Sequence, residues 1–94
     1  MHIITRKRLN EFAEKYPDAK SALEHWYRLM KSEQIRSFAE LRAIFPGADQ
    51  VGKLTVFNIG RKVRLIAAIH YNRQKVYIRA VLTHDEYDKG KWRE

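Results

Sequence analysis

Four side chains in the second half of the chain could together act on a phosphate group: Arg64, Arg79, His84 and Tyr87. Guanidinium groups bind phosphate oxygens through paired hydrogen bonds and stabilise negative charge that develops during a reaction. Histidine exchanges protons near neutral pH, and a tyrosine hydroxyl can orient or donate to a phosphate oxygen. The alternative is structural: two solvated arginines on a sheet, an ordinary histidine near a helix cap and a half-buried tyrosine.

Basic and aromatic residues are interspersed around these four side chains. Such a mixture is typical of proteins that bind single-stranded RNA, because bases stack on rings while cations follow the phosphates. Reading duplex DNA would instead need a basic recognition helix, and residues 1–51 are nearly neutral, with 9 basic and 7 acidic residues. The candidate RNA-binding residues are Lys53, Arg61, Lys62, His70, Arg73, Lys75, Tyr77, Lys89 and Lys91.

The segment that carries these residues has the hydrophobic pattern of a sheet. Strands are predicted over residues 54–59, 63–71 and 75–82, with turns at residues 60–62 and at Asn72-Arg73. If Tyr71 faces Gln74 across the second turn, one face of the hairpin receives only apolar pairs, which fixes the register. These expected pairs are Ile69–Val76, Ala67–Ile78, Leu65–Ala80 and Val63–Leu82.

The other face of the hairpin is then expected to show His70, Tyr77, Arg64 and Arg79. In this register Arg64 and Arg79 are diagonal neighbours on adjacent strands. Two like charges at that distance repel each other, and a bound phosphate would offset the repulsion. The sequence therefore predicts an anion-binding surface on this side of the sheet.

The first half of the chain is predicted to be helical after a brief strand at residues 2–4. Apolar spacing indicates a helix over residues 9–16 with Thr5 as its N-cap, and a second helix over residues 22–30 capped by Asp18. The capping box Ser37-x-x-Glu40 opens a third helix, and Thr83-x-x-Glu86 opens a short C-terminal turn that carries His84 and Tyr87. The expected fold class is α+β, with N-terminal helices packed on a small twisted antiparallel sheet.

Composition limits the remaining function classes. The 94 residues carry a formal net charge of +8, which favours a polyanionic partner, and the absence of cysteine excludes disulfides and zinc–thiolate sites. The longest apolar run, Leu65 to Ile69, is too short for a membrane span, so a soluble cytoplasmic protein without a membrane partner is expected. No motif for a metal, a nucleotide cofactor or a serine nucleophile occurs, and we expect neither a metal nor a cofactor.

Several stretches resemble the HigB family of bacterial toxins. They are Val56-Phe57-Asn58-Ile59-Gly60 with the following Arg64, Gln74-x-x-Tyr77-Ile78-Arg79, and Thr83-His84-x-Glu86-Tyr87-Asp88-Lys89. The stretches Met1-His2-x-Ile4-Thr5, Glu14-Lys15-Tyr16-Pro17 and Phe45-Pro46 are also similar to that family. The resemblance thus covers essentially the whole chain. The chain departs from the family at Arg61-Lys62, where relatives often have a further glycine or a longer insert.

The resemblance implies one toxin domain over residues 1–94 with a RelE-like fold. It also implies a metal-independent endoribonuclease that cleaves mRNA on the translating ribosome and is neutralised by a HigA-type helix-turn-helix antitoxin. DNA would be met only through the antitoxin complex. Arg64, Arg79, His84 and Tyr87 fall on family-like positions. Two other classes stay open at this point: a non-catalytic RNA- or ribosome-binding module that uses the same face, and a small DNA-binding regulator built on the helices.

Overall fold

The computed structural model describes residues 1–93, and the side chains of residues 1–92. The helices are α1 (Lys7–Lys15), α2 (Lys20–Ser32), α3 (Phe38–Ile44) and α4 (His84–Asp88), with 3-10 turns η1 (Pro17–Ala19) and η2 (Lys91–Arg93). The strands are β1 (His2–Ile4), β2 (Asp49–Val51), β3 (Leu54–Ile59), β4 (Val63–His70) and β5 (Lys75–Thr83). The expected α+β class is confirmed. No helix within residues 1–93 is long and apolar enough to cross a bilayer.

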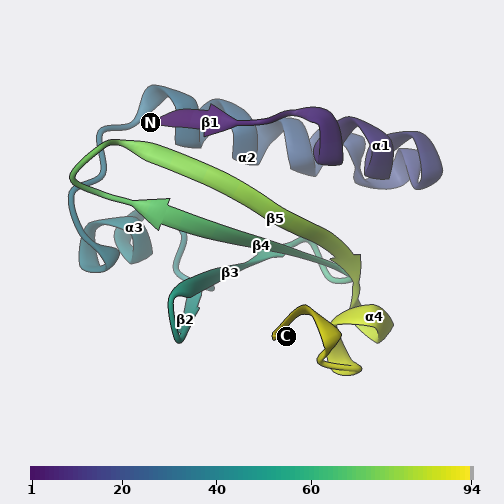
Figure 1. The fold of residues 1–94 in the computed structure, drawn as a ribbon. Coiled ribbons are helices and arrows are strands. Elements are labelled where there is room, and N and C mark those ends of the chain that lie inside the picture. Colours follow the sequence, from purple (N-terminus) through teal and green to yellow (C-terminus); the bar gives the residue numbers. More distant parts are fainter. Residues whose placement is uncertain (94) are drawn as a thin grey trace.

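The five strands form one sheet in the order β1-β5-β4-β3-β2 (Figure 1). Strands β3, β4 and β5 are antiparallel neighbours, as expected. Strand β2, which was not predicted, pairs antiparallel with β3, and β1 pairs with β5 in parallel, so the sheet is mixed. A parallel pair needs a long crossover connection, and α1, α2 and α3 lie within the connection from β1 to the other strands. Figure 1 shows α1 and α2 running along one side of the sheet, with α4 at the other side where β5 ends.

The main hydrophobic core lies between the helices and the sheet face that they cover. Helix α2 contributes Leu23, Trp26 and Met30, which follow a helical spacing and are all buried. From the sheet, Phe57 and Leu65 are buried in the same cluster, and the Trp26 and Phe57 rings make an edge-to-face contact at a centroid distance of 5.3 Å. This core holds β3 and β4 rigidly enough to position side chains on the opposite face.

The helix boundaries differ from the expected ones at two caps. Helix α1 begins after Arg6, and Thr5 accepts only a long hydrogen bond of 3.4 Å from the Lys7 amide. Asp18 does not cap α2; it lies in η1, which continues into α2 through Ala19. By contrast, Ser37 caps α3 as expected, since its hydroxyl accepts from the Glu40 amide at 3.2 Å.

The β4–β5 hairpin has the predicted register near its turn, but a different register at the other end, where β4 begins and β5 ends. Ala67 pairs with Ile78 as expected, but Ile66 pairs with Ala80, so Arg79 is an extra residue in a β-bulge. Beyond the bulge the faces of β5 are exchanged relative to the prediction. The observed pairs are Ile66–Ala80, Leu65–Val81, Arg64–Leu82 and Val63–Thr83, in place of the expected Leu65–Ala80, Val63–Leu82, Ile66–Arg79 and Arg64–Val81.

The sheet face away from α1 and α2 also differs from the open polar surface that was expected. Val56 and Ile66 pair with each other on this face and are both buried, although neither belongs to the main core. Helix α4 contacts β4 and β5, and its Tyr87 lies against Arg64, which shares a face of β4 with Ile66 two residues later. The C-terminal segment therefore reaches over this face, which we call the outer face.

Candidate active site

Arg64 and Tyr87 meet where α4 reaches over the outer face. The central carbon of the Arg64 guanidinium lies 5.8 Å from the centroid of the Tyr87 ring, within the range of a cation–π contact. Arg64 is half-buried on β4, and its Nη1 donates to the backbone carbonyl of Val63 at 3.1 Å. These contacts hold a positive charge and a phenol together, as the sequence prediction required of these two residues.

The local sequence fixes α4 directly onto the end of β5. The Thr83 hydroxyl accepts from the Glu86 amide at 3.2 Å, and a Glu86 carboxylate oxygen accepts from the Thr83 amide at 3.0 Å. This is the capping box expected from the sequence. The hydrogen bond from the Thr83 amide is the main reason why the pKa of Glu86 lies below its usual value. In addition, the His84 amide donates to the carbonyl of Lys62 at 2.8 Å, which ties α4 to the β3–β4 turn.

Trp92 is a residue of this site that the sequence did not single out. Its indole stacks on the Tyr87 ring, with a centroid distance of 5.0 Å and an interplanar angle of 12°. The indole Nε1 also donates to the Tyr87 carbonyl at 2.9 Å. Trp92 follows Tyr87 by five residues, a spacing that matches no helical pattern, so the sequence did not pair the two rings. The separation of the two aromatics by a glycine, Gly90, was the available signal of a chain reversal.

His84 is not part of the contact between Arg64 and Tyr87. Its Nδ1 lies 2.9 Å from a carboxylate oxygen of Asp88 one turn later, and both side chains are about half exposed, at 49% and 59%. His84 instead lines a groove of about 980 Å³ between the end of α1 and the β3–β4 turn, together with Lys15, Arg61 and Lys62. His84 therefore belongs to the neighbourhood of the site but faces a different hollow.

Arg79 is also separate from that contact. The bulge places it beside the Ile66–Ala80 pair, whereas Arg64 lies opposite Leu82, so the expected diagonal pairing of the two arginines is wrong. Arg79 is exposed, and among residues 1–93 the structure gives its side chain no hydrogen bond or ion pair.

The candidate RNA-binding residues divide between the two ends of the β4–β5 hairpin. Arg61 and Lys62 lie in the β3–β4 turn, where the Lys62 carbonyl accepts from the first amide of α4, and Lys89 and Lys91 follow α4, so all four lie at the α4 end of the hairpin. The other residues lie at or toward the opposite end of the hairpin. His70 pairs with Lys75, and the His70 and Tyr77 rings lie 5.3 Å apart between centroids. Arg73 and Lys53 are exposed in turns. The structure therefore brings only the first group near the candidate active site.

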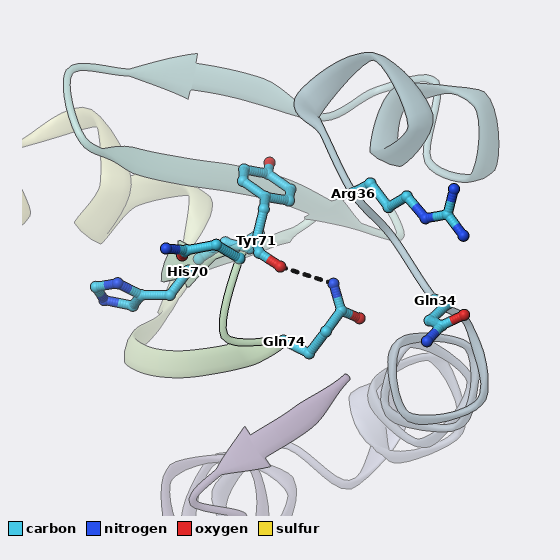
Figure 2. Close-up of a pocket in the computed structure, with 7 residues that line it drawn as sticks. Gln34, Arg36, His70, Tyr71 and Gln74 are labelled. Atoms are coloured by element: carbon cyan, nitrogen blue, oxygen red, sulfur yellow. Dashed lines mark hydrogen bonds between the residues drawn. The ribbon is translucent and has the colours of Figure 1, made fainter.

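A second hollow, of about 660 Å³, opens at the far end of the hairpin (Figure 2). Gln74, which has a positive φ of 55°, donates through Nε2 to the carbonyls of Tyr71 at 2.8 Å and Ile35 at 2.7 Å. The bond to Tyr71, together with one from the Gln74 amide to the same carbonyl at 3.3 Å, closes a four-residue turn over residues 71–74, longer than the two-residue turn expected. The bond to Ile35 joins this turn to the segment before α3. Burial raises the pKa of Tyr71, and the nearby Thr55 side chain offsets part of that effect. Figure 2 shows the His70 and Arg36 side chains directed to opposite sides.

No group of three or more His, Asp or Glu side chains within residues 1–93 is arranged to hold a metal ion. The cationic group at the Tyr87 ring is the Arg64 guanidinium. The chemistry that this arrangement supports is the binding of a phosphodiester next to a fixed phenol.

Comparison with known proteins identifies the family. The family model described as HigB_toxin, RelE-like toxic component of a toxin–antitoxin system, matches residues 19–90. The chain belongs to the HigB toxin family. The mRNA interferase toxin HigB of Escherichia coli (strain K12) is 39% identical over 92 residues, which cover 94% of this chain and 88% of the relative. The mRNA interferase HigB of Shigella flexneri matches equally well, and that of Escherichia coli O6:H1 (strain CFT073) is 33% identical over 93 residues, 95% of this chain and 90% of the relative.

The HigB match confirms the expected family and spans α2 to α4. It includes the four candidate residues Arg64, Arg79, His84 and Tyr87 but ends before Trp92. The fold agrees as well, since HigB toxins are described as RelE-like and this chain has helices on a five-stranded sheet. As the toxic component of a toxin–antitoxin system, a HigB toxin implies an antitoxin partner.

Proposed function

We propose that this HigB-family chain is an endoribonuclease that cleaves mRNA, and that residues 1–94 form one toxin domain. The observation that carries the proposal is the contact between Arg64 and Tyr87, which joins a phosphate-binding cation to a proton donor on the outer face. Its relatives of 39% and 33% identity are named mRNA interferases. A basic sequence with a net charge of +8 supports a polyanionic substrate.

The proposed reaction uses the RNA itself as nucleophile. The 2′-hydroxyl loses its proton and attacks the adjacent phosphorus, and the bond from phosphorus to the 5′ oxygen of the next nucleotide breaks. The leaving oxygen takes a proton, so the products carry a 2′,3′-cyclic phosphate and a 5′-hydroxyl. Arg64 stabilises the negative charge on the phosphoryl oxygens, and the Tyr87 hydroxyl donates to an oxygen of the same phosphate. These groups supply the charge stabilisation, so we propose that cleavage needs no metal ion and no cofactor.

Arg79 and His84 take supporting roles in this proposal. The exposed Arg79 guanidinium binds a neighbouring phosphate and sets the path of the strand. His84 pairs with Asp88 beside the basic β3–β4 turn. It exchanges a proton with the reacting RNA when the RNA strand lies between the groove and α4. Arg61, Lys62, Lys89 and Lys91 hold the same strand through its phosphates, and the residues at the far end of the hairpin contact more distant nucleotides.

The proposed setting is the translating ribosome in the cytoplasm, and the proposed inhibitor is a HigA-type antitoxin. The family supports the antitoxin, since its model describes the toxic component of a toxin–antitoxin system. The ribosome is the expectation that the sequence resemblance implies. DNA is met only through the antitoxin complex, because the helices of this chain present no strongly basic surface: residues 1–51 carry 9 basic and 7 acidic residues.

A second candidate function is binding of RNA or of the ribosome without cleavage. One observation favours it: Arg79 and His84 do not converge on the contact between Arg64 and Tyr87. A binding module would need only the cations of the outer face, without a defined phenol.

Expression of the chain in bacteria separates the two candidates. We expect growth arrest with mRNA cut inside coding regions, and no arrest with the Arg64→Ala variant at equal soluble level. Arrest with intact mRNA would favour the binding module. Normal growth with soluble wild-type protein would contradict the toxin proposal itself.

A further inference from the structure

Trp92 makes two separate contacts with one residue, Tyr87. The indole covers one face of the phenol ring at a centroid distance of 5.0 Å, nearly parallel at 12°. Its Nε1 donates to the backbone carbonyl of the same residue at 2.9 Å. One contact restrains the ring and the other restrains the backbone, so together they define where the Tyr87 hydroxyl lies relative to β4.

The chain reversal that allows these contacts is built into the sequence after α4. Gly90 has a φ of 74°, which side chains larger than hydrogen disfavour, and its amide donates to the Tyr87 carbonyl at 3.0 Å. The Tyr87 carbonyl therefore accepts from both the Gly90 amide and the Trp92 indole. The reversal leads into η2 and returns the indole onto the ring, so Trp92 is placed by backbone geometry as well as by stacking.

The Arg64 guanidinium also lies over the Tyr87 ring, at 5.8 Å from its centroid. A nucleobase cannot stack on the ring face that the indole already covers, although stacking is a common use of tyrosine in RNA-binding proteins. The phenol hydroxyl is then the group that Tyr87 offers to the RNA. Cleavage depends steeply on such placement, since small displacements of a reacting group lower rates strongly.

We infer that Trp92 is a positioning residue of the active site: it holds the Tyr87 ring so that the hydroxyl, and not the aromatic face, is presented to the scissile phosphate. This inference rests on the proposed function. The C-terminal segment would then contribute to the reaction through Trp92 as well as through the charges of Lys89 and Lys91. Trp92 lies outside the part of the chain that the family model matches.

The test compares three variants with the wild type in single-turnover cleavage of an RNA at saturating and subsaturating protein. Trp92→Leu removes the ring and the donor, whereas Trp92→Phe keeps a ring that can stack. Tyr27→Leu is the matched control, because it removes a half-buried aromatic ring on α2 that also lies under a cation, Arg6, at 4.3 Å. Thermal melts on the same preparations show that each variant is folded.

We expect Trp92→Leu to lower the saturating rate at least about tenfold, within the loss typical of a misplaced proton donor, with little change in RNA affinity. Trp92→Phe should recover most of the rate, and Tyr27→Leu should cleave like the wild type. Nuclear magnetic resonance provides an independent readout, because loss of the indole ring current should shift the Tyr87 ring signals in Trp92→Leu but leave the core methyl signals unchanged.

Two results would overturn the inference. One is an unchanged saturating rate in Trp92→Leu despite shifted Tyr87 signals, and the other is a loss confined to RNA affinity, which would make Trp92 part of the binding surface. A wild-type protein that binds but does not cut RNA would instead contradict the proposed function, and with it the role of Trp92. The two failures are distinguished by which protein fails to cleave.

Discussion

The guanidinium of Arg64 lies over the ring of Tyr87 at 5.8 Å, although 22 residues of strand, turn and helix cap separate them in the sequence. Strand β4 is fixed by the main core on one face, and α4 is fixed by its capping box at the end of β5. The pair is therefore held by two elements whose positions are set independently. That arrangement suits a site that stabilises charge on a phosphate, because a preorganised cation needs little rearrangement during the reaction.

Replacement of Arg64 tests the cation of this pair. We expect Arg64→Ala to lower the single-turnover cleavage rate about 10²–10³-fold, the usual cost of losing one donor to a developing oxyanion. Arg64→Lys should recover only part of the loss, because lysine lacks the paired donors of the guanidinium. Arg42→Ala, at an exposed position of α3, is the control for loss of one positive charge. Equal rates for the Arg64→Ala and Arg42→Ala variants would remove Arg64 from the site.

The bulge residue Arg79 should affect binding more than cleavage. We expect RNA affinity to fall with salt with a log–log slope of roughly −3.5, as for about five phosphate contacts on a single strand. Arg79→Ala should make that slope shallower by about 0.7, the contribution of one contact. The rate of cleavage at saturating protein should change much less than in Arg64→Ala. A loss of rate as large as that of Arg64→Ala would show that Arg79 contacts the scissile phosphate.

Protonation of the Glu86 carboxylate at acidic pH should weaken the N-terminal cap of α4. The Thr83 amide stabilises the Glu86 carboxylate, so the pKa is lower in the folded protein than in the unfolded chain. The carboxylate therefore stabilises the cap fully above the unfolded value of about 4.3, and this contribution is lost as the pH falls through the lowered folded value. Nuclear magnetic resonance of the Thr83 amide should report the transition. Glu86→Gln, which can still form a capping box, should abolish it; an unchanged transition would assign it to another group.

Leu65 tests the core that supports the site. It is fully buried and lies between Phe57 on β3 and Val81 on β5. We expect Leu65→Ala to lower the free energy of unfolding by about 2–5 kcal/mol, measured by urea denaturation. Leu54→Ala, at the partly exposed start of β3, should cost much less. Activity should be lost in proportion to the unfolded fraction, so stabilising conditions should restore it; persistent inactivity of folded protein would indicate a direct role in catalysis.

Most of the fold could be predicted because its elements follow simple periodicities. Trp26 and Met30 lie on one helical stripe, and the short apolar run from Leu65 to Ile69, bounded by turn residues, marks a buried strand. The strand β2 was missed because it has three residues, two of them polar and exposed. The bulge at Arg79 left no trace because Ala80, Val81 and Leu82 are all apolar, so either register places an apolar side chain in the core.

The candidate site could be predicted only in part. Arg64 and Tyr87 were singled out by their chemistry, and the structure brings them together. The expected diagonal pairing of Arg79 with Arg64 is wrong because Arg79 is the extra residue of the bulge, which leaves Arg64 opposite Leu82 instead of Val81. Trp92 was missed because its contact with Tyr87 depends on a chain reversal at Gly90, which residue spacing does not reveal.

The most direct measurement is single-turnover cleavage of mRNA by the purified protein, with chemical analysis of the new ends, for the wild type and Tyr87→Phe. The wild type should cut in the presence of EDTA and leave 5′-hydroxyl and 2′,3′-cyclic phosphate ends. Tyr87→Phe keeps the ring that contacts Trp92 and Arg64 but lacks the hydroxyl, and its rate should fall about 10²–10⁴-fold with unchanged stability. Ends with a 5′-phosphate, a requirement for magnesium on free RNA, or a Tyr87→Phe rate equal to the wild-type rate would contradict the assignment of cleavage to the Arg64–Tyr87 site.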